Sequence, residues 1–145
     1  EGINDIECNI EHIKQSIDTY NELFVNVVRL TPGITSAEII EKANKSITIK
    51  TNEGIMKRTN ISTTINDESV ILEFDEEYQV GQKIQVNTHY FHEFTVIGNN
   101  IKHRIILSDV KAPGFLGFFY RNFGKSNIGN SILNSYRDYF MMTKK

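Results

Sequence analysis

Two histidines are the residues of this chain best placed to do chemistry together. His92 and His103 fall on the same face of two neighbouring segments, residues 86–96 and 101–107, in which apolar and polar side chains alternate. On adjacent strands the two imidazoles would meet, and such a pair can relay a proton or bind a metal ion. The alternative is a pair of core histidines, or a strand face misassigned by one residue. We favour this alternative because a one-residue slip reverses every side chain.

Other reactive residue types lack the partners that catalysis needs. Cys8 is the single cysteine, and no base that would lower its pKa is identifiable in the sequence. Alternation places most of the acidic side chains of residues 67–77 on a solvent face, so we expect no catalytic carboxylate pair there. Gly114 and Gly117 lack the lysine and hydroxyl spacing of a phosphate loop. We therefore assign no catalytic residue, no metal site and no cofactor.

Composition predicts one ordinary soluble domain over residues 1–145. The chain is 39% hydrophobic and 23% charged, and its net charge of −2 gives no general attraction to nucleic acid. No apolar run approaches the roughly 20 residues that span a bilayer, and the N-terminus lacks the residue order of a signal peptide. A cytoplasmic location is the expectation.

The first third of the chain mixes helical and strand patterns. Residues 6–10 alternate as a strand, and Asn9 is a candidate N-cap for a short amphipathic helix, or a pair of helices, ending near residues 21–24. Residues 25–28 are valine-rich and precede the turn at residues 31–33, which predicts a further strand. Residues 36–45 fit a helix or a strand.

At least five strands joined by short turns follow, which predicts an antiparallel meander. The alternating segments are residues 46–50, 55–65, 70–75, 86–96 and 101–107. The C-terminal segment has helical spacing instead, with a stripe formed by Ile128, Ile132, Tyr136 and Tyr139 and with Leu133 and Phe140 at its margin.

This order of elements resembles the START-like, or SRPBCC, superfamily, which includes pollen-allergen and polyketide-cyclase-like families. Residues 6–13, Ile-Glu-Cys-Asn-Ile-Glu-His-Ile, look like its opening strand and first helix. Residues 111–123, with their glycines and phenylalanines, are similar to its passage from last strand to last helix. The resemblance implies an α+β fold: a curved antiparallel sheet of about six or seven strands, wrapped around a long C-terminal helix, with short helices after the first strand.

The resemblance also implies an apolar pocket between the sheet and the C-terminal helix. Ile55, Ile61 and Val70 belong to the expected inward face of the sheet. The candidate ligand-binding residues are Leu72, Phe74, Tyr90, His92, Phe94, His103, Ile105, Phe115, Phe119 and Phe123. The alternative is that these side chains simply fill the core.

We therefore expect binding or carriage of an apolar small molecule of the lipid, sterol or polyketide class. One alternative is an enzyme of the cyclase or dehydratase type, with Tyr90, His92 or His103 as acid and base. Another is an interaction module that contacts a protein or membrane through residues 115–123, although membrane contact is not expected.

Overall fold

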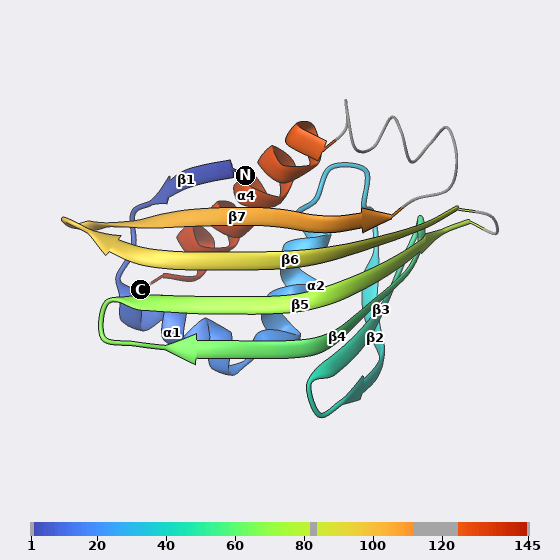
Figure 1. The fold of residues 1–145 in the computed structure, drawn as a ribbon, viewed down its shortest axis with the longest axis horizontal. Helices are drawn as coiled ribbons and strands as arrows, with labels where there is room; N and C mark the ends of the chain where they lie inside the picture. Colours follow the sequence, from blue (N-terminus) through green and yellow to red (C-terminus); the bar gives the residue numbers. More distant parts are fainter. Residues whose placement is uncertain (1, 82–83, 112–124, 145) are drawn as a thin grey trace.

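The computed structural model describes residues 2–81, 84–111 and 125–144, and those residues form seven strands and three helices. In chain order the elements are β1 (Gly2–Ile6), α1 (Ile10–Asp18), α2 (Tyr20–Arg29), β2 (Ala37–Ala43), β3 (Ser46–Thr51), β4 (Gly54–Ile65), β5 (Ser69–Val80), β6 (Ile84–Ile97), β7 (Asn100–Lys111) and α4 (Lys125–Thr143). All strand pairs are antiparallel, in the order β1-β7-β6-β5-β4-β3-β2 (Figure 1). The predicted α+β class and antiparallel meander are confirmed.

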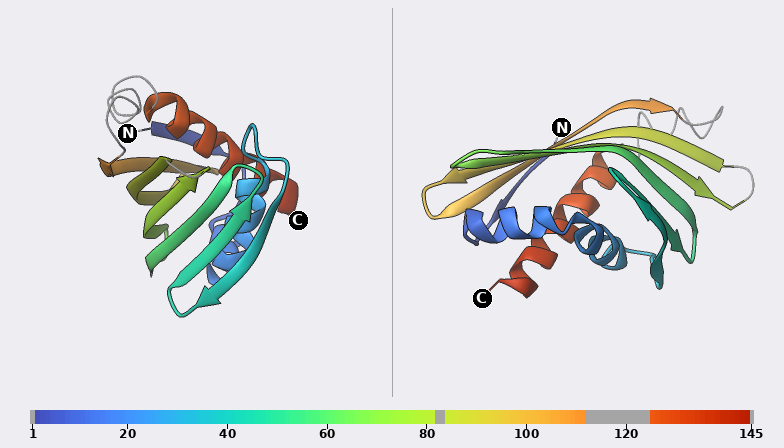
Figure 2. Two further views of the ribbon diagram at one scale, coloured as in Figure 1. Left: turned by 90° about the vertical axis from the view of Figure 1, so that its right-hand side faces the viewer. Right: turned by 90° about the horizontal axis from the view of Figure 1, so that it is seen from below.

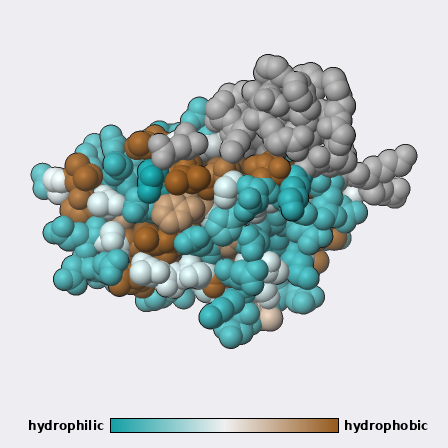
Figure 3. All heavy atoms as spheres, viewed as in Figure 1, coloured by the Kyte–Doolittle hydropathy of each residue, from teal (hydrophilic) through white to brown (hydrophobic). Residues whose placement is uncertain are grey.

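The three helices lie together on one face of the curved sheet (Figure 2). The core therefore forms between that inner face and the helices, as expected for a sheet with one covered side. The outer face is mostly hydrophilic, with apolar side chains between the polar ones (Figure 3). Within the described part of the chain, no helix combines the length and apolarity needed to cross a bilayer.

The segment after β1 forms two helices, and the second is longer than the sequence predicts. Asn9 caps α1, since its side-chain oxygen accepts a hydrogen bond from the backbone N–H of Glu11 at 2.9 Å. The strand predicted over residues 25–28 is wrong, because α2 continues to Arg29. Val27 and Val28 are buried one helical turn beyond Leu23 and Phe24, so packing of this face outweighs the strand preference of valine.

Residues 36–45 are settled as a strand. β2 pairs with β3, and the register shifts between Ile39 and Glu41. Most β2 side chains after Ala37 are exposed, and β2 forms one edge of the sheet. Helix-favouring residue types thus occupy a strand whose pairing with β3 overrides local propensity.

A β-bulge in β4 reverses the face predicted for the first half of that strand. Thr59 pairs with Asp75 and Ser62 pairs with Glu73, so β4 holds one extra residue between the two pairs. Asn60 lies within this bulge with a φ of 54°. Ile61 is buried as expected, but the expectation for Ile55 is wrong. Its side chain is 45% exposed, because strict alternation cannot continue through a bulge.

The buried stripe of α4 differs slightly from the predicted one. Leu133, Tyr136 and Phe140 are buried, whereas Ile132 and Tyr139 are only partly buried. The helix approaches β1 closely: a Cβ atom on Gly2 would lie 2.8 Å from Cδ1 of Leu133. Glycine at position 2 therefore allows α4 to pack tightly against β1, with Leu133 as the contact residue.

Candidate functional site

His92 on β6 and His103 on β7 form a hydrogen-bonded pair, with Nδ1 of His92 2.9 Å from Nε2 of His103. Both rings are fully buried. Burial lowers the pKa of His103 to about 3. Burial, and then unfavourable charge interactions with His103 and Arg58 on protonation, lower the pKa of His92 well below its ordinary value. The pair is therefore neutral near pH 7, and one of the two facing nitrogens carries the shared proton.

Strand register explains why these histidines meet. His92 pairs with Ile105, and Phe94 pairs with His103, so the two imidazoles are diagonal neighbours on the inner face. The Phe94 ring stacks on His103 with a centroid distance of 4.2 Å. From the helix side, the Tyr136 ring lies 4.7 Å from the His92 ring. The pair is thus enclosed by aromatic side chains from both layers.

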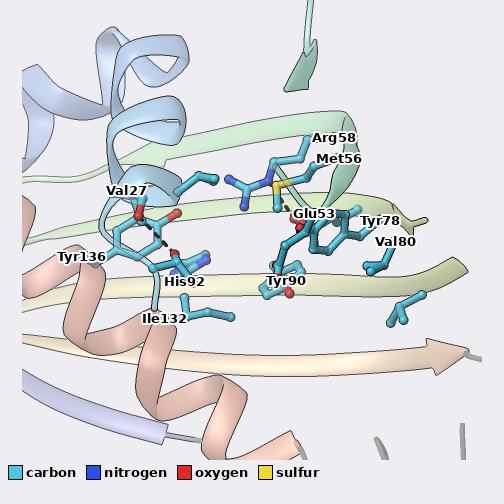
Figure 4. A pocket seen from close by; sticks show the side chains of 14 residues that line it. Val27, Glu53, Met56, Arg58, Tyr78, Val80, Tyr90, His92, Ile132 and Tyr136 are labelled. Atoms are coloured by element: carbon cyan, nitrogen blue, oxygen red, sulfur yellow. Dashed lines mark hydrogen bonds and ion pairs between the residues drawn. The ribbon is translucent and has the colours of Figure 1, made fainter. Parts of the chain in front are cut away.

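A cavity of about 350 Å³ begins beside this pair and runs between the helices and the inner face of the sheet. Figure 4 shows side chains from β4, β5, β6, α2 and α4 around it. The lining residues are Val27, Val28, Thr31, Glu53, Met56, Arg58, Glu76, Tyr78, Val80, Val86, Tyr90, His92, Ile132 and Tyr136. Apolar side chains predominate, with a few polar groups among them, which is the usual character of a small-molecule site.

The predicted ligand-binding residues divide into two groups. Tyr90 and His92 line the cavity. Leu72, Phe74, Phe94, His103 and Ile105 are buried in the surrounding core and do not line it. Phe115, Phe119 and Phe123 lie outside the described residues. Most of the predicted residues that the structure describes therefore belong to the core beside the cavity, and fewer belong to its wall.

A buried ion pair, which sequence reasoning missed, forms part of the wall. Nε of Arg58 on β4 lies 3.0 Å from Oε1 of Glu76 on β5, and both side chains are less than 10% exposed. Burial is the largest single effect and lowers the pKa of Arg58, but Glu76 together with Tyr136 and Tyr90 outweighs it, so the pKa is raised. The guanidinium carbon also lies 4.6 Å from the ring centroids of Phe24 and Phe74, so the cation packs over two adjacent aromatic rings.

Tyr78 marks the opposite part of the cavity wall from the histidine pair (Figure 4). Its hydroxyl donates a hydrogen bond to Oε1 of Glu53 at 3.1 Å and lies 3.2 Å from the Thr51 hydroxyl. Burial is the main reason that the pKa of Tyr78 is raised to about 12. This phenol is neutral at ordinary pH and already has its partners.

Tyr136 is the polar residue that α4 contributes to the cavity. Burial raises the pKa of its hydroxyl to about 12, although the nearby Arg58 guanidinium acts in the opposite direction. Among the residues described, no hydrogen bond of good geometry reaches the Tyr136 hydroxyl, Nη1 of Arg58 or Nε2 of His92. Nε2 of His92 is therefore unsatisfied within the described structure, while the Arg58 guanidinium and the Tyr136 hydroxyl lie near each other without a hydrogen bond of good geometry.

The remaining residues considered for chemistry do not join this site. Cys8 is half-buried, and burial raises the pKa of its thiol despite the opposing charge of Lys144, so little thiolate forms. His89 lies on the outer face, where its Nδ1 is 2.7 Å from Oδ1 of Asp75 and its Nε2 is 3.0 Å from Oε2 of Glu73. The described residues bring together no group of three or more side chains suited to bind a metal ion.

Comparison with known proteins shows a similar fold but identifies no family and no function. No family model matches the chain, and no curated protein matches it significantly. The chain is similar in structure to a conserved protein from Geobacillus kaustophilus known from its crystal structure, with a TM-score of 0.60 and 10% sequence identity. The similarity covers 99% of this chain and 95% of that protein. At this identity the likeness concerns the arrangement of helices and strands alone.

Proposed function

We propose that this protein binds or carries an apolar small molecule, of the lipid, sterol or polyketide class, in the cavity between its sheet and its helices. The observation that carries the proposal is the cavity itself: about 350 Å³, with valine, isoleucine, methionine and tyrosine side chains predominating in its lining. Moving an apolar molecule from water onto such a surface lowers the free energy of the system, which favours binding. A cytoplasmic location is part of the proposal.

Membership of the START-like superfamily is also part of this proposal. Two short helices follow β1, a meander of six strands follows them, and the later helix α4 packs on the same face of the sheet. That order supports the assignment, in which a curved sheet is wrapped around the C-terminal helix and leaves a pocket beside it.

A second function, proton transfer on a bound molecule, is favoured by one observation: Tyr90 and His92 both line the cavity. The depressed pKa of His92 argues against it, because a buried imidazole that resists protonation is a weak base. Binding without catalysis is therefore our leading proposal.

Occupation of the cavity is tested with a neutral apolar fluorescent probe, N-phenyl-1-naphthylamine, and a variant that fills the space. Val86 is a half-buried residue of β6 that lines the cavity, and Val86→Trp adds bulk there. We expect the affinity for the probe to fall by about tenfold or more, a loss of about 1.4 kcal/mol of binding free energy. Fluorescence titration measures it.

Val96→Trp is the matched control, because Val96 is also a half-buried valine of β6 but does not line the cavity. The control variant should bind the probe like the original protein. Equal probe binding by Val86→Trp and the original protein would exclude this cavity as the binding site. Native mass spectrometry of gently purified protein adds an independent readout, since a copurifying apolar molecule should be displaced by the probe.

A further inference from the structure

Three polar side chains of the cavity wall lie at the end away from Tyr78, which we call the polar end and define as Arg58, His92 and Tyr136. The His92 and Tyr136 rings are 4.7 Å apart. Figure 4 shows the Tyr136 and Arg58 side chains reaching toward each other from α4 and β4. Each of the three side chains is at least nine-tenths buried, with exposed fractions of 7% for Arg58, 0% for His92 and 1% for Tyr136.

Each member of the polar end has one hydrogen-bonding atom that no hydrogen bond of good geometry reaches from the described residues, although the Arg58 guanidinium lies close enough to the Tyr136 hydroxyl to lower its pKa. These atoms are Nη1 of Arg58, Nε2 of His92 and the Tyr136 hydroxyl. A buried polar group without a partner costs about 1–3 kcal/mol, so a cluster of three is unusual in a core. A ligand oxygen that accepts a hydrogen bond from Arg58 and bonds to His92 and Tyr136 would satisfy the cluster.

The charge at the polar end is already balanced. Glu76 lies 3.0 Å from Nε of Arg58 and neutralises its charge, while the His92 and His103 pair is neutral. A ligand carboxylate would therefore add a buried negative charge without a compensating cation, which is strongly unfavourable. An uncharged oxygen avoids this cost.

The histidine pair also lets His92 adapt to the ligand. In one arrangement Nδ1 of His92 donates to Nε2 of His103, and Nε2 of His92 is then an acceptor. In the other, Nε2 of His103 donates to Nδ1 of His92, and Nε2 of His92 carries a proton and is a donor. Because both arrangements keep the 2.9 Å hydrogen bond, His92 can serve either a hydroxyl hydrogen or a carbonyl oxygen.

We propose that the polar end, Arg58, His92 and Tyr136, recognises an uncharged oxygen, the hydroxyl or carbonyl group of an otherwise apolar molecule. This inference rests on the proposed function, because it orients the ligand within the same cavity. The oxygen lies at the end between α4 and β6, and the apolar body extends toward Met56, Val80 and Val86.

Three probes with one ring system test the inference: naphthalene, 2-naphthol and 2-naphthoate, measured near neutral pH by equilibrium dialysis. We expect 2-naphthoate to bind more weakly than 2-naphthol. In Tyr136→Phe, the affinity for 2-naphthol should fall by about tenfold, the effect of one buried hydrogen bond, while that for naphthalene should not fall. Near-ultraviolet circular dichroism checks that the variant keeps its packing.

Tyr78→Phe is the control, since Tyr78 lines the same cavity but its hydroxyl is already bonded to Glu53 and Thr51. It should leave the ratio of 2-naphthol to naphthalene affinity unchanged. If 2-naphthoate binds most tightly, or if Tyr136→Phe weakens naphthalene and 2-naphthol equally, the inference is overturned and the proposed function stands. The same holds if none of the three binds while N-phenyl-1-naphthylamine does. Failure of all four probes overturns both.

Discussion

At the residue scale, the ion pair of Arg58 and Glu76 is buried, with both side chains less than 10% exposed. Two opposite charges are withdrawn from water, and their attraction must offset the loss of hydration of both. The adjacent Phe24 and Phe74 rings, which the guanidinium overlies, add cation–π contacts. Removing one partner leaves the other as an uncompensated buried charge.

A double-mutant cycle tests this coupling. Arg58→Met and Glu76→Gln singly should each lower the free energy of unfolding, by about 3–5 kcal/mol when a charge is left unpaired. The double variant should lose clearly less than the sum of the two, because it leaves no isolated charge. Urea unfolding followed by circular dichroism measures all four proteins.

Arg137→Met provides the comparison, since its ion pair with Asp138 is exposed at the surface. That change should alter stability by about 0.5 kcal/mol or less. Strict additivity of the Arg58 and Glu76 substitutions would show that the two side chains do not act as a pair.

At the element scale, the bulge in β4 decides which side chains reach the cavity. Met56 and Arg58 precede the extra residue and face inward, and Ile61 follows it and faces inward too. Without the bulge, one of these two sets would point to solvent. Asn60 lowers the energetic cost of the bulge, because asparagine adopts a left-handed backbone more readily than most residues.

Substitution of Asn60 tests the role of its backbone conformation. Asn60→Val should destabilise the protein by about 1–2 kcal/mol more than Asn60→Gly, because a β-branched residue is strained at a φ of 54° and glycine is not. Both variants lose the hydrogen bond from Asn60 to Asp75, so the comparison isolates the backbone effect. Thermal unfolding gives the difference.

Thr64→Val, at an exposed position of the same strand, should change stability little. Equal melting temperatures for the valine and glycine variants at position 60 would mean that the bulge relaxes to accept a side chain of any shape.

The sequence predicted the inner faces around His92 and His103 because β5 pairs with β6 in unbroken register, and β6 pairs with β7 in unbroken register from His89 to Ile97. The register shift of the second pair lies beyond this stretch, between Asn87 and His89. The sequence missed Arg58 because the bulge reverses the pattern. It missed Glu76 because an acidic run looks like a solvent face, although Glu76 shares the inward face of β5 with Leu72 and Phe74 and pairs there with Arg58. Asn60 was the available signal, as a residue type that tolerates a positive φ within a long alternating run.

At the scale of the whole molecule, two sets of histidines act on stability in opposite directions. His92 and His103 have pKa values lowered by burial, so the unfolded chain binds their protons first and stability falls as the pH drops below about 6.5. The pKa of His89 is raised, first by its hydrogen bond to Asp75, so it adds stability below about pH 6.5 that is lost as the pH rises through its folded value.

Unfolding free energies measured between about pH 7 and pH 5 separate the two effects. The buried pair should dominate, because it is withdrawn from water whereas His89 is partly exposed and screened. We expect stability to fall over this range. His103→Gln should make the fall shallower by about 2 kcal/mol, the effect of one histidine that stays neutral when folded.

His89→Gln should make the same fall steeper, by less than about 1 kcal/mol because the site is at the surface. A His103→Gln profile parallel to that of the original protein would show that His103 gains its proton equally in the folded and unfolded states.

The sheet order has a consequence for how this chain folds. Each strand from β2 to β6 pairs with the next strand in the sequence, so the six strands β2 to β7 can assemble through successive hairpins with short loops. β1 pairs instead with β7, and Gly2 meets Ile105 about 100 residues away. Closing that loop costs more conformational entropy than forming any of the hairpins. β1 should therefore dock late, once β7 is in place. Both ends of the described chain would then complete the fold together, since α4 packs against β1.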